Sequence, residues 1–310
     1  ATIFAQADLA FGKGWIVTGG LSLNTSLVEF NRLSVVPSFN YKTNFNNQVA
    51  PRLSVLKKIG ENVSLYALVS KGFSPPTVAE LLPSTSVINT DLQAEKGTNY
   101  EFGFRSSFIS NRLFIDINTF SFGLENAISQ RRDVSGADYF INAGKTKQKG
   151  VETSLNYYIV RNSDKFVTTS NTWLSYSYHH FKYAEFKQVA TDFSNNKIPG
   201  IAPHTLAAGF NIETRPGLYL NANTFYSSKI PLNDANAEFA DSYFLLGFRA
   251  GYKKALSRHI NAGFFINGDN LLNETYSLGN DINAAANRFY NTAPGINFMA
   301  GISLQYGFKK

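Results

Sequence analysis

The stretch that decides the fold is His204-Thr-Leu-Ala-Ala-Gly-Phe-Asn-Ile-Glu-Thr214, followed by Arg215-Pro-Gly217 and Leu218-Tyr-Leu-Asn-Ala-Asn223. Small or polar residues alternate with Leu206, Ala208, Phe210 and Ile212 before the turn, and with Leu218, Leu220 and Ala222 after it. A period of two places alternate side chains on opposite faces of a β-strand. The stretch therefore predicts an antiparallel hairpin with one apolar face.

The second face of such strands is polar but carries few charges. Leu113, Ile115 and Ile117 oppose Asp116 and Asn118 in the same way, and the pattern returns at 260–267. In a water-soluble sandwich this face would meet bulk water and carry many charges. Asn, Ser, Thr, Gly and Tyr are instead typical of a hydrated barrel interior. We therefore expect lipid on the apolar face and water on the other.

We expect about thirteen strands, joined by connections that alternate between short and long. The predicted strands are 2–11, 15–27, 49–59, 63–72, 97–109, 113–130, 139–159, 166–183, 204–214, 218–229, 243–255, 259–271 and 296–308. The predicted short turns lie at 12–14, 60–62, 110–111, 162–164, 215–217 and 257–258, and the long connections at 28–48, 74–95, 132–138, 184–202, 231–241 and 276–294. Short turns on one rim and long loops on the other are typical of an outer-membrane barrel, whose short turns are periplasmic.

Composition excludes several other classes. The chain has 310 residues, a net charge of +7, no Cys and only 16% charged residues, against about 25% in an average soluble domain. We find no apolar run near the roughly 18 to 20 residues of a membrane-spanning helix. The Lys and Arg residues are dispersed, which argues against nucleic acid as a partner. Without Cys there is no disulfide framework or cysteine metal site.

The fold class that follows is all-β: a transmembrane antiparallel up-and-down β-barrel. A single-chain bacterial barrel has an even number of strands because both termini are periplasmic. An odd count therefore predicts that the thirteen strands belong to a larger barrel.

Three stretches resemble TonB-dependent outer-membrane receptors. The first comprises Lys71-Gly-Phe-Ser-Pro-Pro-Thr77 and Asn89-Thr-Asp-Leu-Gln-Ala-Glu-Lys96, with Ser74 and Thr90 where Arg and Pro are frequent in the family. The second is Asn142-Ala-Gly144 with Lys149-Gly-Val-Glu152. The third is Asn270-Leu-Leu-Asn-Glu-Thr-Tyr276 with Ala293-Pro-Gly295 and the closing strand.

The resemblance implies a barrel of roughly 22 strands that is blocked by a plug domain. Residues 1–310 are then the carboxyl-terminal portion of the barrel, and we expect the plug and the early strands to be absent from this chain. The implied partners are outer-membrane lipid, the amino-terminal plug with the remaining strands, the TonB complex through the plug segment, and a small-molecule metal chelate. The implied function is import of a scarce nutrient, a ferric siderophore or another iron chelate, across the bacterial outer membrane. A self-contained passive pore and an oligosaccharide or peptide importer are the alternatives.

We predict ligand contacts from aromatic and cationic residues near the long-loop rim, because such side chains stack on and neutralise an anionic chelate. The candidates are Arg131, Arg132, Tyr139, His179, Tyr183, Arg288, Phe289 and Tyr290. Alternation sends His179 inward and His180 outward, which argues against a paired metal or haem site. We expect no catalytic residues, no resident metal and no cofactor, since no nucleophile, His and carboxylate are set on one face.

Overall fold

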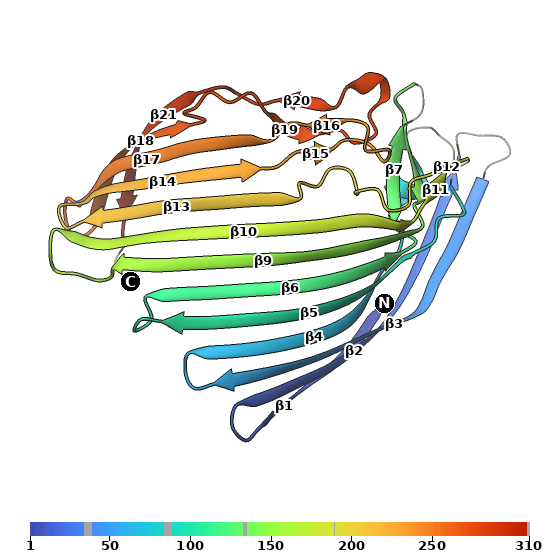
Figure 1. The fold of residues 1–310 in the computed structure, drawn as a ribbon, viewed down its shortest axis with the longest axis horizontal. Coiled ribbons are helices and arrows are strands. Elements are labelled where there is room, and N and C mark those ends of the chain that lie inside the picture. The colour runs from blue at the N-terminus through green and yellow to red at the C-terminus, as the bar shows by residue number, and fades with distance from the viewer. Residues whose placement is uncertain (34–38, 84–88, 133–134, 189, 309–310) are drawn as a thin grey trace.

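The computed structural model describes residues 1–33, 39–83, 89–132, 135–188 and 190–308. Thirteen antiparallel strands form one curved sheet, in which each strand pairs with the next along the chain (Figure 1). They are β1 (Thr2–Phe11), β2 (Trp15–Arg32), β3 (Phe39–Ile59), β4 (Val63–Ser74), β5 (Glu95–Phe108), β6 (Leu113–Glu125), β9 (Lys145–Val160), β10 (Val167–Glu185), β13 (His204–Thr214), β14 (Leu218–Ser227), β17 (Tyr243–Ala255), β18 (Ile260–Asp269) and β21 (Asn297–Tyr306).

The connections at the end of the sheet opposite the short turns carry secondary structure of their own (Figure 1). Four two-stranded sheets lie there: β7 (Ile128–Arg132) with β8 (Asp138–Asn142), β11 (Lys187–Gln188) with β12 (Thr191–Asp192), β15 (Ile230–Pro231) with β16 (Phe239–Ala240), and β19 (Ser277–Asn280) with β20 (Tyr290–Thr292). The helices are α1 (Val78–Leu81) and the 3₁₀ turn η1 (Ala285–Asn287). Neither helix of the described residues has the length and apolarity to cross a bilayer.

The large sheet is open. Its strand order begins at β1 and ends at β21, and these two strands do not pair with each other. Both clusters of buried apolar side chains in the described residues lie at the loop end, around Tyr183 and around Phe289, and not on the sheet faces. The sheet is therefore a wall whose two faces must both be solvated or covered.

The cross-strand register sorts the side chains of this wall. One face, the inner face, carries polar residues such as Asn156, Asn171, Asn211 and Asn221, which are neighbours on the successive strands β9, β10, β13 and β14. The other, the outer face, carries large apolar side chains that are exposed although they are hydrophobic. Examples are Leu9, Leu21, Leu53, Phe102, Leu220, Phe264, Ile266, Ile302 and Leu304. An exposed apolar surface of this extent marks contact with a partner or a membrane.

The predicted fold is confirmed in its class, strand number and short turns. Each of the six predicted short turns joins two paired strands of the sheet. Strands run further than predicted at 28–48, where β2 continues to Arg32 and β3 begins at Phe39. The added residues do alternate, with Val28 and Phe30 against Glu29 and Asn31, so these strand ends extend the same pattern beyond the predicted bounds.

Two predicted strands, 113–130 and 139–159, are wrong as continuous elements. The first is broken after β6, where Asn126 has a φ of 56°, and the second before β9, where Gly144 has a φ of 67°. At this point a backbone hydrogen bond joins the two breaks: the amide of Ala143 donates to the carbonyl oxygen of Ala127 at 2.6 Å. The break turns β7 and β8 away from the wall and into a separate hairpin.

Gly217 should tolerate no side chain. Its φ is 107°, and an added Cβ would lie 1.9 Å from the carbonyl oxygen of Lys253 on the neighbouring strand. We expect Gly217→Ala to lower the free energy of unfolding by about 1 to 3 kcal/mol, the cost of a strained left-handed residue. Denaturant unfolding of the detergent-folded protein measures it. Gly12→Ala is the matched control, since Gly12 is also a turn glycine but has nothing within 4 Å of an added Cβ; equal losses for both variants would contradict the explanation.

Candidate functional site: the inner wall and the loop cluster

The inner face carries a row of hydrogen-bonded asparagines across four strands. Asn221 on β14 donates to Asn211 on β13 at 2.7 Å, Asn211 donates to Asn171 on β10 at 3.3 Å, and Asn171 donates to Asn156 on β9 at 3.3 Å. We call these four residues the asparagine ladder. Asn211 and Asn171 both donate and accept within the row, and because an amide is uncharged the row presents polar groups without net charge.

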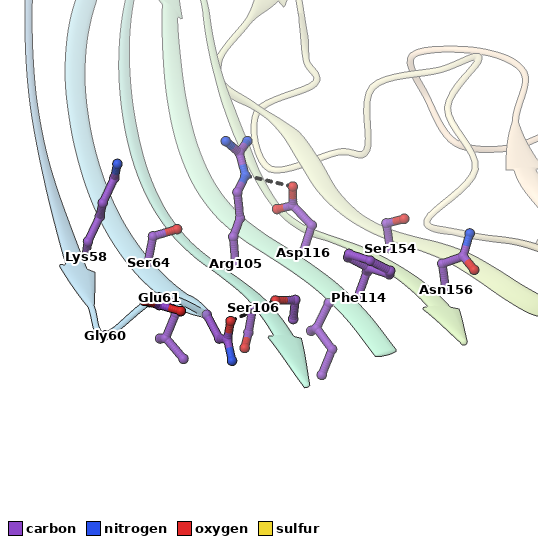
Figure 2. Close-up of a pocket in the computed structure, with 14 residues that line it drawn as sticks. Lys58, Gly60, Glu61, Ser64, Arg105, Ser106, Phe114, Asp116, Ser154 and Asn156 are labelled. Atoms are coloured by element: carbon purple, nitrogen blue, oxygen red, sulfur yellow. Dashed lines mark hydrogen bonds and ion pairs between the residues drawn. The ribbon is translucent and has the colours of Figure 1, made fainter. Parts of the chain in front are cut away.

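Next to the ladder, near the short turns, the inner face forms a hollow with a volume of about 680 Å³. Figure 2 shows Ser64, Arg105, Asp116 and Asn156 pointing into it from β4, β5, β6 and β9. Arg105 Nε lies 2.8 Å from Asp116 Oδ2, an ion pair between two side chains of the inner face. The Arg105 guanidinium also lies 5.1 Å from the centre of the Tyr66 ring. Both charged side chains are about half exposed, so the pair contributes little to stability.

Towards the loop end, a second inner hollow of about 470 Å³ lies between β4, β5, β6 and β9. Its polar lining comes from Asn99, Glu101, Gln148 and Glu152, and its apolar lining from Phe120 and Phe122. Glu101 accepts a hydrogen bond of 2.6 Å from Asn99 Nδ2. Amides, carboxylates and aromatic rings together provide hydrogen bonding and stacking for a polar guest.

Beyond this wall, a buried ion pair joins two loops. Arg131 on β7 places Nη2 2.9 Å from Oδ2 of Asp234, in the loop between β15 and β16. The two side chains are only 5% and 6% exposed. Tyr183, at the end of β10, donates its hydroxyl to Oδ1 of the same carboxylate at 2.6 Å. We call Arg131, Tyr183 and Asp234 the loop cluster.

The backbone around Asp234 ties two more connections to the loop cluster. Asn196 donates to the Asp234 carbonyl at 2.7 Å, and the Asp234 amide donates to Oδ1 of Asn283 at 3.1 Å. The Arg131 guanidinium lies 5.1 Å from the centre of the Phe186 ring. Because a buried charge is expensive without a partner, each of these loops depends on the others for its position.

The hairpin β11–β12 beside this cluster is held by polar contacts. The Asp192 carboxylate accepts a hydrogen bond from the Ser194 amide at 2.9 Å, and Lys187 Nζ lies 3.6 Å from it. The pKa of Asp192 is lowered, mainly because Ser194 donates hydrogen bonds to its charged form. The carboxylate is therefore ionised at neutral pH.

The eight predicted ligand residues fall into different environments. Arg131, Tyr183 and Phe289 are buried, with exposures of 3 to 4%; Tyr139 and His179 are half-buried, and Arg288 and Tyr290 are exposed. Arg131 and Tyr183 meet on Asp234, and Tyr139 stands opposite Arg131 in the β7–β8 hairpin. The side chain of Arg132 lies outside the described part of the structure. Ligand contact by these residues stays a prediction.

His179 lies apart from the loop cluster. Its ring Nδ1 lies 3.1 Å from the carbonyl oxygen of Ala202, and its ring centre is 5.0 Å from that of Phe181. It shares the inner-face parity of Asn171, as predicted, while His180 has the outer-face parity. Within the described residues, no three His, Asp or Glu side chains are grouped as metal ligands would be.

Sequence reasoning missed Asp234, which is the centre of the loop cluster. Asp234 stands in Asn233-Asp-Ala-Asn236, a composition that reads as ordinary turn chemistry. Only its three-dimensional pairing with Arg131, more than 100 positions earlier, distinguishes it. Part of the asparagine ladder could be predicted from the sequence, because Asn211 and Asn221 lie on the predicted polar face.

The quoted motif residues have structural roles at the loop end. Asn142 donates to the carbonyls of Asn126 and Gln93, at 2.6 and 3.1 Å, and accepts from the Gln93 amide at 2.8 Å. Asn89 donates to the Phe140 carbonyl at 2.7 Å. An added Cβ on Gly144 would lie 2.0 Å from the Glu185 carbonyl oxygen. The first two motifs thus bind the β4–β5 connection to the β7–β8 hairpin.

The third motif closes the last long connection. Asn270 is buried and donates to the carbonyls of Glu274 and Pro294, at 2.9 and 3.3 Å, while its Oδ1 accepts from the Glu274 amide. Asn273 accepts from the Ile296 amide at 3.1 Å. Both asparagines have positive φ, at 50° and 54°. These side chains hold the two ends of the connection together at the start of β21.

An antiparallel wall with an apolar outer face, a polar inner face and ordered loops at one end defines the class of the protein: it is part of the wall of a β-barrel. Residues 1–271 match the family described as TonB dependent receptor-like, beta-barrel. The chain belongs to this family, whose barrels are outer-membrane proteins.

Solved structures agree with this fold. The ferric-catecholate import receptor Fiu from K12 E. coli, in its closed form, is 17% identical with a TM-score of 0.73, over 99% of this chain and 44% of that one. The siderophore receptor PiuA from Acinetobacter baumannii is 20% identical with a TM-score of 0.76, over 99% and 43%. The copper transporter OprC is 15% identical with a TM-score of 0.75, over 99% and 47%. This chain therefore spans less than half the length of these structures. The family and these neighbours are receptors and transporters rather than enzymes.

Breaking the loop cluster should loosen several loops together. We expect Asp234→Asn to cost about 3 to 5 kcal/mol, because Arg131 would remain buried without its counter-charge. Amide hydrogen exchange should rise in the connections that contain Arg131, Asn196 and Asn283. The matched control is Asp241→Asn, which removes the exposed pair with Lys229 and should cost less than about 1 kcal/mol. Unchanged exchange in Asp234→Asn would contradict a shared role for the cluster.

Proposed function

We propose that this chain is the carboxyl-terminal barrel portion of an outer-membrane receptor that imports a scarce nutrient, a ferric siderophore or another iron chelate. The observation that carries the proposal is membership of the TonB-dependent receptor family, together with the separation of apolar and polar side chains between the two faces of the sheet. Several structural neighbours are named for ferric ligands: a ferric-catecholate receptor, a ferric yersiniabactin uptake receptor and a ferric citrate transporter. A shared fold does not identify the ligand of this chain, so the ligand class is what the experiment must test.

The open sheet supports a larger barrel in the complete receptor. Within the described sheet β1 pairs only with β2 and β21 only with β18, so each has one unpaired edge, and unpaired strand edges favour further pairing. We propose that additional strands close the barrel between them. A barrel of about 22 strands is too wide to be filled by its own side chains, so a separate plug domain is needed for selectivity. The plug is also the element that we propose contacts TonB.

We propose that lipid covers the outer face. Leu220 on β14 and Phe264 and Ile266 on β18, the two strands that flank β17, are exposed on that face, and in water they would form part of a large aggregation-prone surface. In a bilayer the same side chains meet hydrocarbon, while every backbone group inside the sheet stays hydrogen-bonded. The localisation proposed is therefore the bacterial outer membrane.

For ligand capture, the exposed cation and aromatic residue at the rim are the favoured pair. Arg288 and Tyr290 are exposed on the same connection, next to the buried Phe289. The ring centres of Phe289 and Tyr290 are 6.4 Å apart, so the packed Phe289 fixes the position of Tyr290. Arg131 and Tyr183 then contribute to ligand capture indirectly, because they hold the loops in position through Asp234.

The test of the function is nutrient uptake by the complete receptor. A strain that lacks the receptor gene should lose growth on one ferric chelate as its only iron source and regain it with the intact gene. We expect Arg288→Ala with Tyr290→Ala to weaken chelate binding about tenfold or more, the effect of losing one charge-assisted bond. Binding of labelled ferric chelate to whole cells measures it, with Lys229→Ala as control. Normal iron uptake without the gene, or diffusion of unrelated small solutes through it, would favour an oligosaccharide importer or a passive pore instead.

The membrane placement has its own test. We expect Leu220→Arg to destabilise the folded receptor by about 2 to 4 kcal/mol if this position lies near the bilayer midplane. Asn223→Arg, on the inner face of the same strand, should have a much smaller effect because water solvates the new charge. Urea unfolding in lipid vesicles compares the two. A similar cost for both would argue against lipid on the outer face.

A further inference from the structure

The outer face carries a row of lysines just below the loop end. The register aligns Lys71 on β4 with Thr98 on β5, Thr98 with Gly123 on β6, Gly123 with Lys147 on β9, and Lys147 with Lys182 on β10. Neighbouring strands are about 4.8 Å apart, so the row covers about 19 Å of the wall. One row nearer the short turns, Lys149 stands opposite His180. We call Lys71, Lys147, Lys149 and Lys182 the lysine row.

The lysine row lacks counter-charges of its own. Within the described residues, none of its four ammonium groups makes an ion pair, whereas Lys145, Lys187 and Lys229 nearby each pair with a carboxylate. Lys147 and Lys182 stand directly opposite each other, and like charges at opposed positions destabilise a sheet. An arrangement that costs stability in the protein alone is relieved when an anion binds.

The row borders a hollow that has room for such an anion. A concave region of about 440 Å³ is lined by Lys71, Lys96, Lys147 and the small residues Thr98 and Gly123 between them. An added Cβ on Gly123 would meet nothing within 4 Å. Glu125 and the Lys145–Glu185 pair lie along its loop-side margin. The centre of the hollow is therefore open, lined by small residues and flanked by cationic side chains.

Apolar and aromatic side chains become more frequent in the rows nearer the short turns. The next row holds Val69 and Tyr100 beside Ser121, Lys149 and His180, and the row after it holds Ala67, Phe102, Thr119, Val151 and Tyr178. Tyr100 and Phe102 are 58% and 52% exposed. Aromatic side chains in this position mark the boundary between hydrocarbon and headgroups. A molecule seated here meets cations at its head and apolar surface along its tail.

We propose that the lysine row binds the phosphate groups of a lipid headgroup in the outer leaflet of the membrane. This rests on the proposed placement of the chain in the outer membrane. The row faces away from the lumen, so it does not belong to the nutrient path. Ammonium groups on several strands engage more than one phosphate oxygen at once, and the hollow at Gly123 admits the headgroup between them.

The experiment uses the complete receptor, purified from outer membranes and titrated with lipopolysaccharide or with its enzymatically dephosphorylated form. We expect Lys71→Gln with Lys147→Gln to weaken binding of the phosphorylated form about tenfold or more. The matched control, Lys187→Gln with Lys229→Gln, removes two paired lysines and should stay within about twofold of the parent. Dephosphorylated lipid should bind the parent as weakly as phosphorylated lipid binds the double variant.

A second variant leaves all lysines in place. Gly123→Glu fills the hollow and adds a negative charge, so it should also weaken binding about tenfold, while Gly279→Glu, equally unobstructed, should not. Unchanged binding in both test variants, or equal binding of dephosphorylated lipid, would overturn the lipid site. Chelate uptake in the same cells separates this proposal from the proposed import function, because the lysine variants should still take up the chelate. If the chain were absent from the outer-membrane fraction, the proposed membrane placement would be overturned as well.

Discussion

Backbone hydrogen bonding across an open sheet is the constraint on which the rest of this structure depends. Thirteen strands satisfy one another's peptide groups in sequence, and side chains can then leave the sheet in only two directions. Because the described residues pack no second layer on either face, the side chains of each face must suit the medium that they meet. The exposed Leu220 and Phe264 on one side and the amides of Asn211 and Asn221 on the other meet this requirement.

The loop end is organised by a different interaction. Besides the apolar clusters around Tyr183 and Phe289, Asp234 gathers Arg131, Tyr183 and the connections of Asn196 and Asn283 around one residue. A buried charge pair holds its two loops in one arrangement, because separating the partners would leave a buried charge uncompensated. The loops therefore form one body, on which the exposed Arg288 and Tyr290 are presented.

Sequence alone was sufficient for the wall, because alternation is a local signal and five of the six short turns carry a Gly, Asn or Pro, the exception being Ser257-Arg258. It failed where a side chain or a glycine overrides alternation: the chain leaves the sheet at Asn126 and Gly144, although the apolar pattern continues on both sides. The loop cluster was also out of reach. Arg131 and Tyr183 were chosen as ligand contacts because they are cationic and aromatic, but nothing near them in the sequence indicates that Asp234 pairs with both.

The asparagine ladder has a consequence for how material moves past the inner wall. Carboxylates or guanidinium groups in that position would hold an oppositely charged passenger firmly and repel a like-charged one. Primary amides exchange partners with water at little cost and discriminate weakly between cations and anions. In the proposed importer, a bulky polar guest would therefore pass Asn156, Asn171, Asn211 and Asn221 without being bound strongly, and this weak interaction would depend little on ionic strength.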